Sequence, residues 1–274
     1  MAILEIEGLS KSYGATEVLH DVNLSIDAGE FVAIVGFSGS GKTTLVSAIA
    51  GLLEPDAGEI RVKGRRVTGA GHDRGIVFQQ YALFPWRTAA QNVEFGLDIA
   101  GLKARDRRER AQHYLELVGL SAFAGRYPHE LSGGMKQRVA IARSLAYDPE
   151  VLLMDEPFAA LDAQTRETLQ GELLRIWRTT GKTILFITHG IDEAVVLGQR
   201  VAVMTSRPGR IKHVVEVPEA LRSEEEDIRS LPEFGPVRHE VWSALREEVL
   251  KAQQLAGGAG AVRAKRALED AAHV

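Results

Sequence analysis

The chain has 274 residues, of which 45% are hydrophobic and 26% are charged, a balance typical of a globular protein with a substantial core in one large or two small domains. Its net charge of -4 provides no basic excess to neutralise phosphates, which argues against a dedicated nucleic-acid binder. The absence of cysteine excludes disulfide and thiolate chemistry. Neither a signal peptide nor a bilayer-spanning run is evident, so we expect any membrane role to go through a partner.

Apolar patterning predicts that strands and helices alternate along the chain. Leu4 and Ile6 alternate with polar residues, which is the period of half-buried strands, and longer apolar runs predict buried strands. Apolar residues at helical spacing predict helices within about 88–146 and at 163–180. The further expected strands lie at 22–26, 29–35, 60–62, 76–78, 151–154, 183–187 and 201–204. This alternation indicates a mostly parallel sheet with helices on its faces.

The most informative segment directly follows the expected strand at 29–35. It consists of Gly36, Phe37, Ser38, Gly39, Ser40, Gly41, Lys42 and Thr43, and a helix-compatible run begins at Thr44. Between a strand and a helix, a segment with the spacing G-x-x-x-x-G-K-[ST] forms a phosphate cradle. Its curled backbone directs successive N–H groups at one cluster of phosphate oxygens, and the dipole of the following helix favours the negative charge. Lys42 can bridge the β- and γ-phosphates, and the Thr43 hydroxyl can ligate Mg²⁺. A chance glycine turn is the alternative, but such a match is expected in about one of a hundred chains.

Two acids end the apolar run at 151–154. Asp155 can hold Mg²⁺ directly or through its waters, and Glu156 can orient and polarise an attacking water. Alternatively, the pair with the following Pro157 merely terminates a strand. Because a phosphate loop is present, the functional interpretation is favoured.

A second glycine-lined helix start lies at Ser132, Gly133 and Gly134, ahead of a run whose apolar residues share one helical face. A helix N-terminus of this kind can receive an anion. The chain thus has two sites that can receive phosphate but only one pair of catalytic acids, which is an unusual combination. Analogy with a known fold implies that the second site serves the nucleotide of a partner molecule.

From about residue 3 to 212 the chain resembles the ATPase subunit of an ATP-binding cassette (ABC) transporter, with the diagnostic motifs in order. The resemblance implies an α/β fold of the P-loop NTPase, ABC ATPase type: a mostly parallel core sheet, an antiparallel β subdomain and an inserted helical subdomain. It further implies an ATPase domain at 1–220 with the helical subdomain at about 88–146. A C-terminal helical extension would follow at 221–250, and a flexible Ala/Gly-rich tail at 251–274.

The resemblance also implies roles for individual residues, with ATP and Mg²⁺ as ligands. Residues 36–43 correspond to the Walker A loop, Asp155 to the Walker B acid, Glu156 to the catalytic carboxylate, and residues 131–135 to the signature. The nucleotide-binding residues implied beyond the Walker A loop include Thr44, Ser132, Gly133 and Gly134. Tyr13 corresponds to the adenine-stacking aromatic, Gln79 to the Q-loop glutamine that contacts Mg²⁺ or the attacking water, Asp162 to the D-loop aspartate, and His189 to the switch histidine. From the residues alone, Tyr13 also fits a surface aromatic, Gln80 competes with Gln79, and His189 fits a structural role.

Two positions depart from the family pattern. Met135 stands where the signature usually has Gln, and Gly190 stands where Asp typically follows the switch histidine. The second change removes one carboxylate near the γ-phosphate. Neither change touches the primary catalytic groups.

The aromatic run at 81–86 fits either a local core or an apolar groove that grips a short helix of a membrane subunit. With the stretches at 75–79 and 205–210, it resembles the nitrate, sulfonate and taurine importer group. The implied partners are a second ATPase subunit, integral membrane permease subunits and, indirectly, a periplasmic or surface solute-binding protein, with no nucleic acid. The implied location is peripheral, on the cytoplasmic face of the inner membrane. The alternatives are a soluble ABC-type ATPase outside transport and a nucleotide-sensing regulator.

Overall fold

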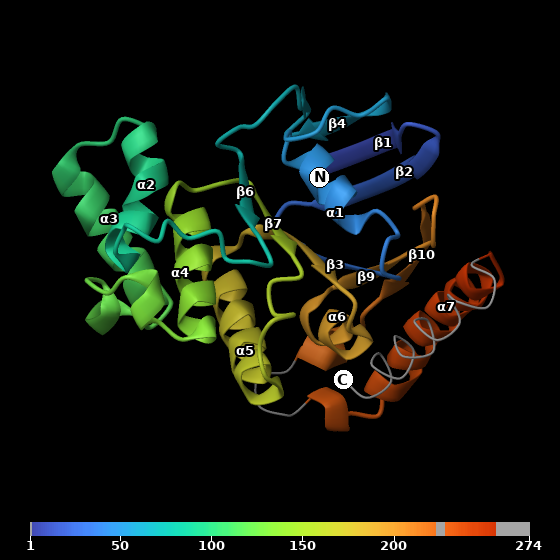
Figure 1. Cartoon of the computed structure of the whole chain (residues 1–274). Coiled ribbons are helices and arrows are strands. Elements are labelled where there is room, and N and C mark those ends of the chain that lie inside the picture. The colour runs from blue at the N-terminus through green and yellow to red at the C-terminus, as the bar shows by residue number, and fades with distance from the viewer. Residues whose placement is uncertain (1, 223–227, 256–274) are drawn as a thin grey trace. The chain divides into compact units, whose positions relative to one another are not determined.

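The computed structural model describes residues 2–222 and 228–255, so the acidic run at 224–227 and the Ala/Gly-rich stretch from 256 lie outside the described residues. The chain forms two compact units (Figure 1). Unit 1 comprises Met1–Ala70 and Leu185–Val274, and unit 2 comprises Gly71–Ile184. None of the helices in the described ranges combines the length and apolarity that crossing a bilayer requires.

Unit 1 contains a four-stranded antiparallel sheet in the order β2-β1-β4-β5. Its strands are β1 (Ala2–Tyr13), β2 (Thr16–Asp27), β4 (Ala57–Val62) and β5 (Arg65–Arg66). Apolar residues such as Leu4 and Ile6 of β1 are buried while Glu7 is exposed, as the alternating pattern predicts. The predicted antiparallel β subdomain is therefore confirmed.

The second sheet of unit 1 positions the phosphate loop. Its strands lie in the order β10-β9-β3-β8. Their bounds are β3 (Phe31–Gly36), β8 (Thr183–Thr188), β9 (Arg200–Met204) and β10 (Ile211–Glu216). β3 pairs with β9 in parallel, whereas β10 pairs with β9 antiparallel. Every residue of β3 is buried, although the strand begins at Phe31 and not at Gly29 as expected.

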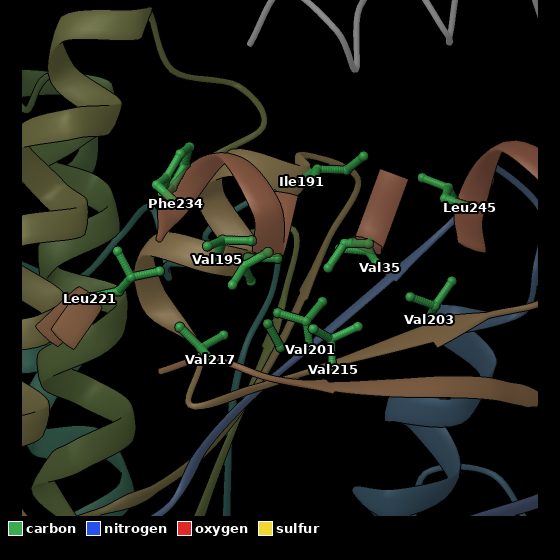
Figure 2. Close-up of a cluster of buried hydrophobic side chains, with 14 residues drawn as sticks. Val35, Ile191, Val195, Val201, Val203, Val215, Val217, Leu221, Phe234 and Leu245 are labelled. Carbon is green, nitrogen blue, oxygen red and sulfur yellow. The ribbon is translucent and has the colours of Figure 1, made fainter. Parts of the chain in front are cut away.

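The α-helices of the described part of unit 1 are α1 (Lys42–Ile49), α6 (Ile191–Leu197) and α7 (Phe234–Leu255), which is red in Figure 1. Apolar residues of α6 and α7 bury the valines of β9 and β10 in one cluster. Figure 2 shows Val201 and Val215 of the strands in this cluster together with Phe234 and Leu245 of α7. The C-terminal helix is thus part of the core of unit 1.

Unit 2 contains the parallel pair β6 (Arg74–Val77) and β7 (Val151–Asp155) and most of the helical sequence. Its α-helices are α2 (Ala89–Ile99), α3 (Ala104–Leu117), α4 (Gly133–Ala146) and α5 (Ala163–Thr180). Figure 1 shows α2, α3 and α4 packed beside one another. The predicted helix at 163–180 is confirmed, whereas Phe78 is a half-exposed residue after β6 and not part of a strand.

Candidate functional site

The phosphate loop connects β3 to α1, as predicted. Gly41 precedes the first residue of α1 and has a φ of 95°, in the left-handed region where glycine is favoured. A Cβ atom on Gly41 would stand 2.8 Å from Leu19 Cδ2 and 3.1 Å from the Val18 carbonyl oxygen. A Cβ on Gly36 would stand 2.9 Å from Ser40 Oγ. The loop therefore packs closely against β2 at Gly41 and against its own Ser40 side chain at Gly36, which leaves no room for a side chain at either glycine.

Lys42 lies inside this loop. Its side chain is 6% exposed, and its ammonium donates hydrogen bonds to the carbonyl oxygens of Gly36 at 2.8 Å and Phe37 at 3.1 Å. Thr43 is exposed at the first turn of α1. The buried Ser40 hydroxyl has no hydrogen-bond partner in the described part of the chain. A buried cation, an accessible hydroxyl and a helix N-terminus together fit the phosphate tail of a nucleotide.

The other two candidates of unit 1 are aromatic. Tyr13 ends β1 and is 52% exposed, so its ring is accessible for stacking. His189 is exposed between β8 and α6. The Thr188 hydroxyl accepts a 3.0 Å hydrogen bond from the Gly190 backbone N–H and donates one to the buried carboxylate of Glu193. These bonds fix the backbone on both sides of His189.

Three candidates of unit 2 follow neighbouring strand ends. β6 and β7 pair in parallel with Val77 opposite Met154, so the residues that follow leave the same edge of the sheet. Gln79 is exposed two residues after β6, and Asp155 ends β7 with 8% of its surface exposed. Parallel strands deliver functional side chains at their carboxyl ends. Gln79 and Asp155 therefore lie at the same edge of this strand pair.

Glu156 has an unusual backbone. Its φ is 45°, in the left-handed region that costs a non-glycine residue about 1–3 kcal/mol and is found mainly at functional sites. A residue that merely terminated a strand would need no such conformation. The strained backbone thus favours the catalytic interpretation of Glu156 over the structural one.

Ser132 caps α4, accepting a 3.3 Å hydrogen bond from the Met135 backbone N–H. A Cβ on Gly133 would stand 3.3 Å from the Tyr81 hydroxyl, and one on Gly134 would stand 2.9 Å from Thr165 Cγ2. The glycines therefore let other segments of unit 2 approach the start of α4. Ser132 itself stays exposed, where its hydroxyl is accessible to a ligand.

Asp162 caps α5. Its carboxylate accepts hydrogen bonds from the Thr165 backbone N–H at 2.9 Å and from the Thr165 hydroxyl at 2.7 Å, and these bonds lower the pKa of the Asp162 carboxyl. A helix cap alone accounts for this residue type at this position. The proposed D-loop role of Asp162 stays a prediction.

Arg143 is a candidate that sequence reasoning missed. From α4 its guanidinium donates hydrogen bonds to the carbonyl oxygens of Tyr81 at 3.0 Å and Ala82 at 2.6 Å, and it also faces the Phe84 ring. Tyr81 and Ala82 have φ values of 59° and 47°. Arg143 therefore holds a strained segment just after Gln79. The sequence signal that could have indicated Arg143 is a charged residue among the small and apolar residues in the second half of α4.

The candidate residues thus form two groups, one on each unit. Unit 1 carries the phosphate loop, Tyr13 and His189, and unit 2 carries Gln79, Asp155, Glu156, Asp162 and the start of α4. In the described ranges no group of three or more His, Cys, Asp or Glu side chains could hold a metal ion. The hydroxyl of Thr43 and the carboxylate of Asp155 are hard oxygen donors of the type Mg²⁺ takes when substrate phosphates supply further ligands.

Known proteins resemble this chain in sequence and in fold. The ABC transporter family matches residues 19–159 of the chain. The nitrate import ATP-binding protein NrtD of Synechocystis sp. is 51% identical over 252 residues, covering 89% of this chain and 95% of that protein. The chain belongs to the ABC transporter family. The taurine import ATP-binding protein TauB of Roseobacter denitrificans is 47% identical over 240 residues, covering 85% of this chain and 90% of that protein.

An ATP-binding cassette solved as a dimer in a post-hydrolysis state, with ADP and Pi, matches the structure with a TM-score of 0.69 and 35% identity. The match covers 78% of this chain and 99% of that cassette. The predicted family and the predicted P-loop fold of the ABC ATPase type are confirmed. This ABC protein is an ATPase. The comparisons leave the roles of single residues as predictions.

Proposed function

We propose that this ABC ATPase powers the import of nitrate, a sulfonate, taurine or a similar small solute through a partner permease. The observation that carries the proposal is the phosphate loop between β3 and α1, with Lys42 buried inside it. The relatives named for nitrate and taurine import support the class of solute. A peripheral position on the cytoplasmic face of the inner membrane follows from this role, with a solute-binding protein acting indirectly.

The proposed chemistry is attack of water on the γ-phosphorus of ATP, which releases ADP and phosphate. Tyr13 stacks on adenine, the backbone N–H groups of the phosphate loop hold the phosphates, and Lys42 stabilises negative charge on the γ-phosphoryl group. Glu156 orients the water and accepts its proton, while His189 and Gln79 contact the γ-phosphate and the water. Thr43 and Asp155 would hold Mg²⁺, which neutralises charge on the phosphates when bound.

A second copy, or a related subunit, completes each site. Ser132, Gly133 and Gly134 at the start of α4 receive the nucleotide held by the partner's phosphate loop, and Asp162 lies at the same seam. Support comes from the second glycine-lined helix start in a chain with one catalytic acid pair, and from the dimeric cassette that resembles this structure. ATP closes the pair, and hydrolysis with release of phosphate reopens it.

The surface that passes this change to the permease is the aromatic segment at 81–86. Trp86 is 70% exposed, and its ring lies 5.7 Å from that of Phe84, which packs at 4.4 Å against Phe95 of α2. Arg87 covers the Phe95 ring and lines a charged cleft of about 310 Å³ on α2 and α3. An exposed aromatic beside a cleft with both signs of charge suits a short amphipathic helix.

The proposal is tested by co-expressing the chain with its permease subunits and measuring ATP hydrolysis in membranes. We expect hydrolysis by the wild type to rise when permease and solute-binding protein are present. The Glu156→Gln variant should bind ATP and form a stable dimer, yet hydrolyse it at a rate lower by a factor of at least about 100. Hydrolysis that no membrane partner stimulates would favour the soluble ABC ATPase, and a fully active Glu156→Gln variant would remove the role given to Glu156.

A further inference from the structure

The loop that connects β9 to β10, residues 205–210, leaves the sheet beside the phosphate loop. β3 and β9 are parallel neighbours, and their last residues Gly36 and Met204 lie opposite each other. The loops that follow therefore start at the same sheet edge, where α/β proteins bind their ligands. This loop carries two arginines, Arg207 and Arg210.

The two loops are in direct contact. Gly209 donates a 2.8 Å hydrogen bond to the carbonyl oxygen of Val18 and accepts one of 3.1 Å from the His20 backbone N–H. A Cβ on Gly209 would stand 2.1 Å from the carbonyl oxygen of Ser40, so no larger residue fits here without displacing the phosphate loop. The 205–210 loop thus shares a fixed boundary with the phosphate loop.

Bonds inside the loop and from α7 keep it in one conformation. The Thr205 hydroxyl donates to the Pro208 carbonyl oxygen at 2.7 Å and accepts from the Arg210 backbone N–H at 2.8 Å. The carboxylate of Glu248 on α7, 2% exposed, accepts 3.3 Å and 3.4 Å hydrogen bonds from the backbone N–H and hydroxyl of Ser206. Such anchoring on both sides presents the intervening side chain, Arg207, in a defined position.

Arg207 lies against the phosphate loop. Its Nη2 atom is 3.8 Å from the position that a Cβ on Gly39 would occupy, so the guanidinium lies close to this glycine of the phosphate loop. The side chain is exposed, and no hydrogen bond or ion pair with another residue of 2–222 or 228–255 holds its guanidinium. A guanidinium with five donors beside a loop built for phosphate is suited to bind an anion.

We propose that Arg207 binds the phosphate tail of the nucleotide held by residues 36–43 of the same chain. It adds a charge-assisted hydrogen bond from outside the phosphate-loop motif, and Glu248 supports it by anchoring the loop. The proposal rests on the proposed function, because it presumes that the phosphate loop takes ATP. A charge-assisted hydrogen bond at an exposed position corresponds to about a tenfold change in affinity.

The test measures ADP and ATP affinity by titration calorimetry on the full chain, with Mg²⁺ present, at low and high salt. We expect Arg207→Ala to weaken binding of both nucleotides about tenfold at low salt and less at high salt, because screening reduces an exposed charge contact. Arg207→Lys should recover part of the loss. The matched control is Arg210→Ala, which removes the same charge from the same loop and should stay within about twofold of the wild type.

Binding of both nucleotides by Arg207→Ala within twofold of the wild type would overturn the proposal. Loss of ATP-driven dimer formation with unchanged ADP affinity would also overturn it, since Arg207 would then contact the second copy. The Lys42→Ala variant distinguishes failure of the Arg207 proposal from failure of the proposed function. If the wild type and Lys42→Ala bind ATP equally, the phosphate loop itself is not the nucleotide site. Equal melting temperatures of ligand-free wild type and Arg207→Ala would exclude a folding effect.

Discussion

Arg143 on α4 is hydrogen-bonded to the carbonyl oxygen of Tyr81, in the segment that follows the candidate Gln79. Its guanidinium also bonds the carbonyl oxygen of Ala82, so one side chain fixes two consecutive residues with left-handed backbones. The helix that begins at the signature and the loop after Gln79 are thereby joined. These two contacts join residues that are 61 and 62 positions apart in the sequence.

Replacing Arg143 should therefore release strain in the loop and leave two carbonyl oxygens without their partner. We expect Arg143→Ala to lower the free energy of unfolding by about 1–3 kcal/mol, measured by urea denaturation. Arg143→Lys keeps the charge but has no two-pronged donor, so it should recover less than half of the loss. Stability equal to that of the wild type in both variants would show that the clamp contributes nothing.

The cap of α5 should give a measurable acid dependence. The pKa of the Asp162 carboxyl is lowered by hydrogen bonds from Thr165, so the charged carboxylate stabilises the folded state fully above its ordinary value near pH 4. That contribution is lost as the pH falls through the lowered pKa. Asp162→Asn keeps a capping oxygen without a titrating charge, so its stability relative to wild type should improve as the pH falls from about 5 to 2. Thermal unfolding of both proteins as a function of pH measures this dependence. A difference in stability between Asp162→Asn and the wild type that stays constant across this range would contradict the role of the charged Asp162 carboxylate as the cap.

Glu248 should be far more important than its neighbour Glu247. Both bond Lys212, but Glu248 is 2% exposed and also accepts the hydrogen bonds of Ser206. We expect Glu248→Ala to cost about 1–3 kcal/mol of unfolding free energy, because it leaves the part-buried donors of Ser206 and Lys212 without this partner. The matched control Glu247→Ala removes an exposed partner and should cost less than about 1 kcal/mol. Equal losses, measured by chemical denaturation, would mean that burial of Glu248 has no consequence.

The phosphate loop should not accept a side chain at Gly41. In Gly41→Ala the new Cβ would meet Leu19 Cδ2 at 2.8 Å in a backbone with a φ of 95°, so both stability and ATP affinity should fall sharply. Gly64→Ala is the control, because Gly64 also has a positive φ of 70° but no atom within 4 Å of the added Cβ. It should cost about 1–2 kcal/mol of stability from backbone strain alone and leave ATP affinity unchanged. Similar ATP affinities of the two variants would argue against a tight cradle.

How far the sequence predicts this molecule depends on how local each feature is. The strand, glycine loop and helix around Lys42 are contiguous, so spacing alone predicts both their structure and their chemistry. The clamp by Arg143 and the anchor at Glu248 are different, because each joins segments that are far apart in the chain. The partners of Arg143 are backbone carbonyl oxygens, and one partner of Glu248 is a backbone N–H group. Backbone partners leave no trace in the residue types. The position of Arg207 beside Gly39 likewise follows from the pairing of β3 with β9 and not from any motif.

The central claim, that each ATP is hydrolysed between two copies, is tested most directly by mixing two inactive variants. Lys42→Ala lacks the phosphate-loop half of each site, and Ser132→Arg lacks the signature half. In an equimolar mixture, half of the dimers pair unlike chains, and each of these has one intact site, so ATPase activity should recover to about a quarter of wild type. Each variant alone should stay inactive. Full activity of Ser132→Arg alone, or no recovery in a mixture that demonstrably forms mixed dimers, would contradict the claim.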